Sequence, residues 1–305
     1  MIKDFVTIGL LTYNSKDTIK RALDGLVEQT YPFKEIAIFD DYSTDGTYEI
    51  CQEYAQRFSF IRLIRNEKNI GVFKNVNQMI SHVKGEYFLW ACADDYYASD
   101  FLEKLVPPMQ HESHTIISTC AIKIIYEQGP IISFHYHDFS KTISFKRMAW
   151  NVIFSRNSTG ELVGYNSIIH TLVRSSYLPK IHYWQQLVFC EQLWVVHALI
   201  WGKISYIDEA LYTKYRDAIP LSARIPALYK LTLNFSWQLV ESFRYLLHFL
   251  SCQNVKREKK RRYFFSYILS VIWIFHMKVQ ALKRTISQYK LASRCIALFN
   301  KTYKL

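Results

Sequence analysis

Short runs of strand-forming residues alternate with segments of helical periodicity through the first hundred positions. The predicted strands are Val6–Tyr13, Glu35–Phe39, Ile61–Ile64 and Tyr87–Trp90. Near-continuous apolar runs of this length are typical of strands that are buried on both faces. Between them, apolar residues recur every three or four positions, as they do from Ile19 to Leu26, which predicts helices. The alternation therefore predicts an α/β fold with a parallel sheet covered by helices.

Polar side chains follow each of these predicted strands. Thr12-Tyr13-Asn14 follows the first, Asp40-Asp41 the second, Asn66 to Gly71 the third and Asp94-Asp95 the fourth. In an open α/β sheet, ligands bind at the carboxyl ends of the strands. Two adjacent carboxylates repel each other unless a cation or strong donors offset their charge. A lone Asp-Asp pair is more often a helix cap, but the polar ends of the other strands favour a binding site.

The chain lacks the glycine-rich loops that commonly hold phosphate in such folds. No two of the nine glycines are spaced as GxG, which excludes the GxGxxG fingerprint, and no GxxxxGK segment occurs. We therefore expect that a phosphorylated ligand is held by a divalent cation on Asp94 and Asp95.

Four motifs at these strand ends resemble those of the family 2 glycosyltransferases, which have the GT-A fold. The motifs are Thr12-Tyr13-Asn14, Asp40-Asp41-x-Ser43-x-Asp45-Gly46-Thr47, Asn69-x-Gly71, and Gly85-Glu86-Tyr87-Phe88 leading into Asp94-Asp95. Each motif alone is weak, but four in order over residues 5 to about 105 are highly specific. The resemblance implies a Rossmann-like, mostly parallel sheet flanked by helices, and a nucleotide-diphospho-sugar as the donor.

The resemblance also implies roles for individual residues. The nucleotide-binding residues would be Thr12, Tyr13, Asn14, Asp40, Asp41, Ser43, Asn69, Gly71, Lys74 and Asp94. Among them, the first two would line the base pocket, and one of the two adjacent aspartates after the second strand would bind the base edge. Asp94 and Asp95 would hold Mg²⁺ or Mn²⁺ against the diphosphate. The family often has a further Asp two residues before Asp94, where this chain has Cys92, so the sequence leaves open which carboxylate contacts the metal directly.

A more mixed pattern follows in the second half of the chain. Predicted strands are Thr115–Tyr126, Ile131–Phe139 and Ile168–Val173. A short helix is predicted over Asp100–Met109, stopped by Pro107-Pro108.

Glu191 is the candidate catalytic base. It precedes Gln192 at the start of a predicted helix that Gly202 closes, and the chain then runs to Tyr215-Arg216. The resembling family has Glu-Asp or Glu-Asp-Gln at this helix start, with the Asp as base, and alignment on Gln192 places Glu191 at that Asp. The alternative is that Glu191 only complements the helix dipole.

The net charge of +12 is partly concentrated near the C-terminal end, where Lys256 to Arg262 adjoins the aromatic run Tyr263 to Phe275. That run is shorter than the roughly 20 apolar residues of a transmembrane helix. Two interpretations stay open: a peripheral contact with an anionic membrane surface, or a helical appendage packed on the catalytic domain. Nucleic acid is not expected as a partner, because the basic cluster borders a continuous apolar run.

Six scattered cysteines without CxxC spacing, and an N-terminus without a signal-peptide pattern, predict a cytoplasmic protein, peripheral on the inner face of the plasma membrane if the tail binds lipid. The expected domains are a catalytic domain over 1–220, with a nucleotide-sugar half (1–110) and an acceptor half (111–220), and a helical C-terminal region over 221–305.

The function that we predict is inverting, metal-dependent transfer of a hexose to a hydroxyl of a surface-glycan or lipid-linked acceptor, in polysaccharide biosynthesis. Two alternatives stay open. A nucleotidyltransferase also uses an α/β sheet and paired carboxylates, but it should carry a glycine- and basic-rich loop after its first strand. A catalytically silent nucleotide-sugar-binding subunit is suggested by Cys92 and by Glu191 in place of Asp.

Overall fold

The computed structural model describes residues 1–127, 131–136, 165–180 and 190–216, together with five single residues, Arg257, Lys260, Arg262, Phe264 and Ile268. The strands are β1 (Ile2–Thr12), β2 (Lys34–Asp40), β3 (Ile61–Arg65), β4 (Gly85–Cys92), β5 (Tyr96–Tyr97), β6 (Thr115–Tyr126), β7 (Ile131–Phe134), β8 (Leu172–Arg174) and β9 (Lys203–Arg216). The α-helices are α1 (Lys16–Val27), α2 (Thr47–Arg57), α3 (Val72–Ser81), α4 (Phe101–His111) and α6 (Cys190–Trp201). Two 3₁₀ helices, η2 (Tyr165–His170) and η3 (Ser175–Lys180), flank β8.

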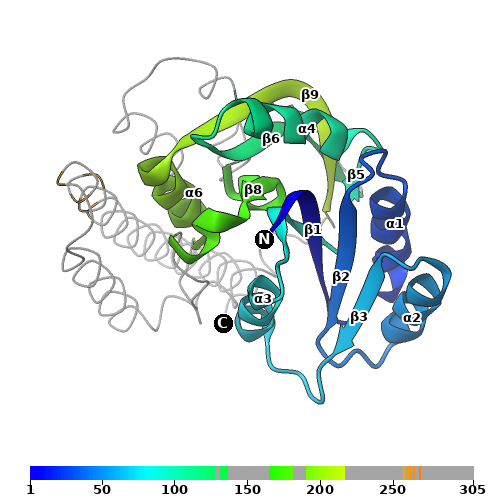
Figure 1. Ribbon diagram of the computed structural model, residues 1–305. Helices are drawn as coiled ribbons and strands as arrows, with labels where there is room; N and C mark the ends of the chain where they lie inside the picture. Colours follow the sequence, from blue (N-terminus) through cyan, green and yellow to red (C-terminus); the bar gives the residue numbers. More distant parts are fainter. Residues whose placement is uncertain are drawn as a thin grey trace, which may run out of the picture.

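One sheet runs through both halves of the molecule, in the order β3-β2-β1-β4-β8-β6-β9-β5, with β7 paired to β6 (Figure 1). The first four strands are all parallel, as the alternation of strand and helix predicts. In the second half, β8 runs antiparallel to both β4 and β6, whereas β6 and β9 are parallel. The predicted α/β class with a Rossmann-like first half is confirmed.

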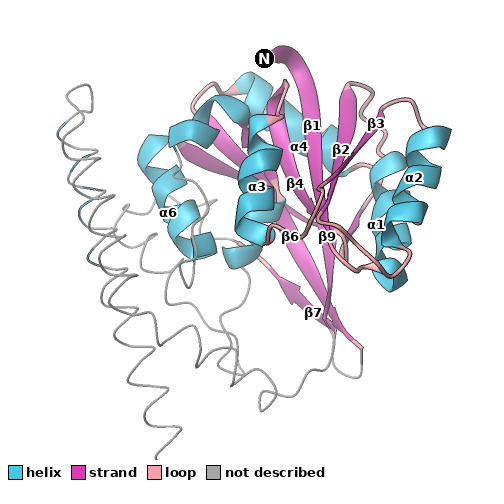
Figure 2. Cartoon of the chain, turned by 90° about the horizontal axis from the view of Figure 1, so that it is seen from below, coloured by secondary structure: helices cyan, strands magenta, loops and turns pink. Residues whose placement is uncertain are grey.

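Helices cover both faces of the parallel strands. α1 and α2 lie on one face and α3 on the other (Figure 2). The helical spacing from Ile19 to Leu26 explains this position, because the apolar side chains on that face of α1 are fully buried.

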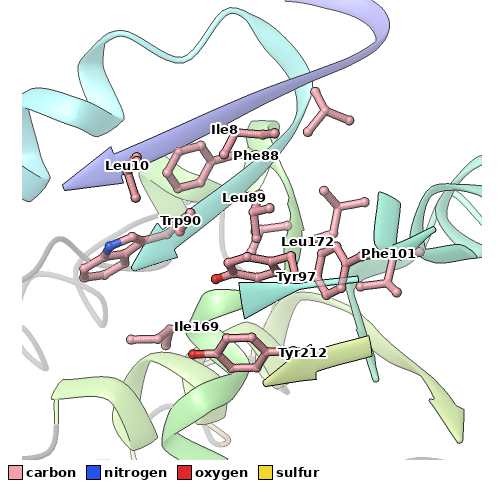
Figure 3. Packing of buried hydrophobic residues seen from close by; sticks show 14 of the residues in the cluster. Ile8, Leu10, Phe88, Leu89, Trp90, Tyr97, Phe101, Ile169, Leu172 and Tyr212 are labelled. Atoms are coloured by element: carbon pink, nitrogen blue, oxygen red, sulfur yellow. The ribbon is translucent and has the colours of Figure 1, made fainter. Parts of the chain in front are cut away.

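The core continues from the parallel strands into the second half of the sheet. Phe88 and Leu89 of β4 face the interior, and the rings of Tyr97 and Tyr212 stack with centroids 5.0 Å apart (Figure 3). Phe101 meets the ring of Tyr97 edge to face. These aromatic contacts hold the short strand β5 against the end of β9, next to the predicted metal site.

Two secondary-structure predictions were wrong in detail. α4 spans Phe101–His111 rather than the predicted Asp100–Met109, so the two prolines do not stop it; buried residues on both sides of them, such as Val106 and Met109, hold the helix in the core. Half of the predicted strand Ile168–Val173 belongs to the 3₁₀ helix η2, and only Leu172–Arg174 is extended. Periodicity does not distinguish a short buried strand from a short buried helix.

The described part of β7 ends at Phe134, whereas the predicted strand continued to Phe139; residues 137–164 lie outside the described residues. The predicted C-terminal region 221–305 also lies outside them, except for the five single residues. In the part of the chain that the structure describes, no helix has the length and apolar character needed to cross a bilayer.

Candidate functional site

The carboxyl ends of β1, β2 and β4 meet at one edge of the sheet. Thr12 is paired with Asp40 across the β1–β2 register, and Leu11 is paired with Cys92 across the β1–β4 register. The polar segments that follow these strands are therefore neighbours in space, as the sequence predicts.

Asp41 fastens the segment between β3 and α3 to this edge. Its Oδ1 accepts hydrogen bonds from the Asn66 side chain (2.9 Å) and the Ile70 amide (2.8 Å), and its Oδ2 accepts one from the Gly71 amide (2.9 Å). The carboxylate is only 3 % exposed. Oδ2 has one further lone pair, so Asp41 can both hold this segment and accept one more hydrogen bond.

Asp40 lies beside it but has a different environment. Its side chain is fully buried, and Oδ2 accepts the Ser43 amide at 3.1 Å and lies 3.4 Å from Nε of Arg65. Oδ1 of Asp40 is buried without a hydrogen-bond partner among the described residues. The two adjacent aspartates therefore have separate roles in the local structure, and each retains capacity to accept one more hydrogen bond.

Two loops at the tips of β1 and β2 are tied to each other. The Asn14 amide donates to Oγ of Ser43 at 3.0 Å, and the Thr44 amide donates to Oδ1 of Asn14 at 3.0 Å. Tyr13 projects from this pair of loops with half of its surface exposed. An exposed ring on a fixed loop is available to stack on a planar ligand.

The remaining predicted nucleotide-binding residues lie around the start of α3. Oδ1 of Asn69 accepts the Gly71 amide at 3.0 Å. Gly71 has φ of 83°, which an L-residue rarely adopts, and a Cβ added there would meet no atom within 4 Å. Glycine is therefore required here by the backbone turn. Lys74 is exposed in the first turn of α3.

The candidate metal ligands lie just beyond β4. One ligand atom from each of Cys92, Asp94 and Asp95 lies within 4.8 Å of the other two. Asp94 is exposed, whereas Asp95 is fully buried. The guanidinium of Arg21 donates to the Asp94 carbonyl at 2.6 Å and lies 3.7 Å from the centroid of the Tyr215 ring, which fixes the loop to the end of β9.

Asp95 is held by the last residues of β9. The Tyr212 hydroxyl donates a hydrogen bond to its Oδ2, and the Tyr215 amide lies 3.3 Å from its Oδ1. Burial raises the pKa of Asp95 to about 6; the charge of Lys214 and these two hydrogen bonds oppose the rise, and the neighbouring Asp94 adds to it. The carboxylate is thus ionised at neutral pH and chemically suited to a cation.

The donor set fits a hard divalent cation. Mg²⁺ and Mn²⁺ prefer carboxylate and phosphate oxygens, and the exposed Asp94 leaves room for oxygens of a ligand or water. Burial raises the pKa of the Cys92 thiol well above its ordinary value, with Asp95 adding to the rise, so the metal-free site holds a neutral thiol. Asp94 and Asp95 are therefore the residues here that would hold the metal.

Cys92 instead contacts a buried histidine. Its Sγ lies 3.3 Å from the nearer ring nitrogen of His170, and that imidazole lies 3.2 Å from the Trp90 carbonyl. Burial and the charge of Lys214 hold the pKa of His170 well below its ordinary range. Cys92 and His170 are therefore both neutral, and they lie next to Trp90 at the end of β4.

Glu191 is the second residue of α6, as predicted, but its side chain lies outside the description. Sequence reasoning missed four residues that the structure brings to the strand ends: Arg65, His170, Tyr212 and Lys214. Only Tyr212 and Lys214 could have been found from the sequence, because they alternate with Arg216 along one face of the strand β9.

The fold is that of solved nucleotide-sugar glycosyltransferases of the GT-A type. The S. aureus protein TarS 1-349 in complex with UDP-GlcNAc superposes with a TM-score of 0.58 at 17% sequence identity, over 94% of this chain and 92% of that one. The mannosyltransferase PcManGT from Pyrobaculum calidifontis, solved with GDP-Man and Mn2+, gives a TM-score of 0.54 at 17% identity, over 96% of this chain and 80% of that one. At these identities the likeness establishes the fold.

The family follows from the sequence. The model of glycosyl transferase family 2 matches residues 7–165, more than half of the chain, and the protein belongs to this family. A relative, the cholesterol galactosyltransferase of Borreliella burgdorferi, is 25% identical over 284 residues, which are 90% of this chain and 77% of that protein. Membership in a glycosyltransferase family argues against the nucleotidyltransferase alternative.

Proposed function

We propose that this protein transfers a hexose from a nucleoside-diphosphate donor to a hydroxyl group of a lipid or glycan acceptor, with inversion at the anomeric carbon. The observation that carries the proposal is the position of Asp94 and Asp95. They follow β4 beside the ends of β1 and β2, so a nucleotide that lies over Thr12 and Asp41 would direct its phosphates toward them.

The donor's base would lie on the side of Tyr13 and the two adjacent aspartates. An exposed ring offers stacking, and a carboxylate oxygen with free capacity offers a charge-assisted hydrogen bond to an N–H of the base. Asp40 and Asp41 each have such an oxygen, although both are buried. The base itself is left to experiment, because the two solved relatives hold different nucleotides, UDP-GlcNAc and GDP-Man.

Asp94 and Asp95 would hold Mg²⁺ or Mn²⁺, which when bound neutralises charge on the diphosphate. The support is the carboxylate geometry and the presence of Mn2+ in the mannosyltransferase structure. The protein's own contribution is to keep Asp95 ionised in a buried place, through the hydrogen bonds from Tyr212 and the Tyr215 amide.

Glu191 would remove the proton from the acceptor hydroxyl as that oxygen attacks the anomeric carbon. Its place in the first turn of α6 favours an ionised carboxylate, because the N-terminal end of a helix carries partial positive charge. Attack on the face opposite the diphosphate inverts the configuration.

The acceptor is proposed to be an alcohol on a lipid or on a surface glycan. The name of the galactosyltransferase relative, whose alignment covers most of this chain, includes a sterol acceptor. A lipid-linked acceptor would also suit the predicted tail, with its basic cluster beside an aromatic run.

A thermal-shift screen of UDP-, GDP-, CDP- and dTDP-sugars, each with Mn²⁺ and with EDTA, tests donor class and metal dependence together. We expect one donor to raise Tm in the presence of Mn²⁺ and to lose most of that effect in EDTA. If no nucleotide sugar stabilises the protein, the proposed donor is wrong; if EDTA has no effect, the metal assignment is wrong.

Turnover separates an enzyme from a silent binding subunit. The stabilising donor is incubated with the protein and with long-chain alcohols or glycolipids, and the anomeric proton is followed by NMR. An active enzyme should hydrolyse the donor slowly without acceptor and should release nucleoside diphosphate faster when acceptor is present. A product whose anomeric configuration is opposite to that of the donor supports inversion. Donor binding without release supports the silent alternative, which Cys92 suggests.

A further inference from the structure

Lys214 follows the residues of β9 that pair with β5, and Asp95 immediately precedes β5. β5 and β9 pair Tyr97 with Tyr212 and Tyr96 with Thr213. The same register carried one residue further places Asp95 opposite Lys214. Directly opposite residues share a face of the sheet, with Cβ atoms about 4.5–5.5 Å apart. The lysine stem therefore starts beside the candidate metal site.

This end of β9 is fixed at several points. The Tyr212 hydroxyl and the Tyr215 amide both bond to the Asp95 carboxylate, and the rings of Tyr97 and Tyr212 stack. Arg21 joins Tyr215 to the Asp94 carbonyl from the other side. A side chain between these contacts, at position 214, is held close to both aspartates by the backbone on either side.

The ammonium group has an electrostatic effect on the whole site but no direct partner in it. Burial raises the pKa of Asp95 and of Cys92, and the charge of Lys214 opposes that rise; burial lowers the pKa of His170, and the same charge adds to that lowering. The ammonium group therefore acts on all three groups. Yet no hydrogen bond or ion pair joins Lys214 to another of the described residues, and the side chain is only partly buried. A cation beside two aspartates that bonds to neither is available to an anion bound between them.

We propose that Lys214 contacts the diphosphate of the donor and stabilises the negative charge of the leaving nucleoside diphosphate. The inference rests on the proposed donor and adds a residue to its binding. The lysine reaches the phosphates from β9, whereas Asp94 and Asp95 approach them from β4. A lysine is a flexible point charge with three donors, which suits a phosphate whose charge grows as the sugar leaves.

Calorimetric titration of the full chain tests this role with three probes: the nucleoside diphosphate that binds best, its nucleoside, and Mn²⁺ alone. The variants are Lys214→Met, Lys214→Arg, and Lys203→Met as a control. Lys203 lies at the opposite end of the same strand with its side chain 69% exposed, so its substitution removes the same charge away from the site.

We expect Lys214→Met to weaken nucleoside diphosphate binding roughly 10- to 100-fold, the range for a hydrogen bond to a charged group. Nucleoside affinity should not change, and Mn²⁺ affinity should stay equal or rise, because a cation that repels the metal is gone. Lys214→Arg should retain part of the diphosphate affinity, and Lys203→Met should bind all three probes as the wild type does.

Two results would overturn the role of Lys214 alone. One is a Lys214→Met protein that binds the diphosphate like the wild type. The other is equal weakening of nucleoside, diphosphate and Mn²⁺, which indicates a structural role. A wild-type protein that binds none of UDP, GDP, CDP or dTDP with Mn²⁺ present would instead overturn the proposed donor, and the Lys214 inference with it.

Discussion

The phenol of Tyr212 donates a hydrogen bond to the carboxylate of Asp95, although the two residues are 117 positions apart in sequence. Both groups are buried, and Tyr212 belongs to β9, in the half of the catalytic domain that was predicted to bind the acceptor (111–220). The carboxylate pair in the predicted nucleotide-sugar half is therefore completed by the other half of the chain. The two predicted halves of the catalytic domain therefore do not form independent units.

Tyr212→Phe should weaken Mn²⁺ binding without unfolding the protein. The substitution keeps the stacked ring but removes a hydrogen bond that stabilises ionised Asp95, which is worth about 1.5–3 kcal/mol when the acceptor is charged. The pKa of Asp95 should therefore rise further, and Mn²⁺ affinity near pH 7 should fall roughly 10-fold. Titration of Mn²⁺ measures this, with Tyr206→Phe, also on β9, as control. Equal affinity in Tyr212→Phe and wild type would contradict the role assigned to the phenol.

Metal binding should depend on pH around the pKa of Asp95. Burial raises this pKa from 3.8 to about 6, which corresponds to roughly 3 kcal/mol. The metal-free fold is therefore favoured below pH 4, where Asp95 is neutral in both states, and it loses this contribution as pH rises through 6. Mn²⁺ needs the ionised form, so the increase of Tm caused by Mn²⁺ should be large at pH 7.5 and small at pH 5.

Asp95→Asn is the control for this pH dependence. It removes the titrating group, so the effect of pH on the metal-free Tm between 4 and 7 should shrink, and Mn²⁺ should stabilise the variant little at any pH. A wild-type Mn²⁺ effect that is the same at pH 5 and 7.5 would show that Asp95 is not a ligand.

Asp41→Asn should loosen the segment that leads into α3. The variant has one acceptor oxygen instead of two, so the segment loses at least one of the hydrogen bonds that Asp41 accepts from Asn66, Ile70 and Gly71; a hydrogen bond to a charged group is worth about 1.5–3 kcal/mol. Hydrogen exchange at the Ile70 and Gly71 amides should become faster, and nucleoside affinity should fall. Glu67→Gln, an exposed change in the same segment, is the matched control. Unchanged exchange in Asp41→Asn would mean that other contacts hold the segment.

Cys92→Asp should make stability depend on the metal. The substitution adds a third carboxylate beside Asp94 and Asp95, where like charges repel. Without metal we expect Tm to fall; with Mn²⁺ the loss should be largely reversed, because the cation offsets the added charge. Cys92→Ser should change little in either condition. A Cys92→Asp protein as stable as wild type in EDTA would argue against this crowding of charge.

Glu191→Gln should lower turnover by roughly 10²–10⁴-fold with little change in donor affinity, since the amide keeps the shape but cannot accept the proton. Glu191→Asp should retain some activity, because it keeps a carboxylate in a retracted position. Single-turnover transfer measures both variants against the wild type. Near-normal transfer by Glu191→Gln would leave Glu191 as a residue that only complements the helix dipole, and Asp138 and Glu161 would be the next bases to test.

The first half of the fold could be predicted because β1, β2 and β4 contain apolar runs that are buried on both faces. The observed strands β1 to β4 differ from the predicted ranges only at their ends. The 3₁₀ helix η2 was not readable in this way, because its apolar residues are buried by tertiary packing rather than by a periodic pattern. The length of α4 likewise depends on tertiary contacts, which the local sequence pattern does not specify.

The strand-end motifs were predicted as neighbours, and the register of β1 with β2 and β4 explains why. The sequence does not reveal which hydrogen bonds or ion pairs each residue of these motifs forms. Nothing in the pair Asp40-Asp41 indicates that one carboxylate accepts an arginine while the other holds the segment before α3. The approach of Tyr212 and Lys214 depends on β9 pairing with β5, a contact between distant segments that periodicity cannot specify.

The junction between α6 and β9 consists of one residue, Gly202, and a Cβ there would lie 2.4 Å from the His114 carbonyl oxygen. The chain therefore has no slack between the helix that carries Glu191 and the strand that carries Lys214. An insertion at this junction would displace one of them relative to the other. If the two residues act on opposite sides of the sugar, this one-residue junction fixes the spacing between them. Related sequences should therefore differ in length at other loops before they differ at this junction.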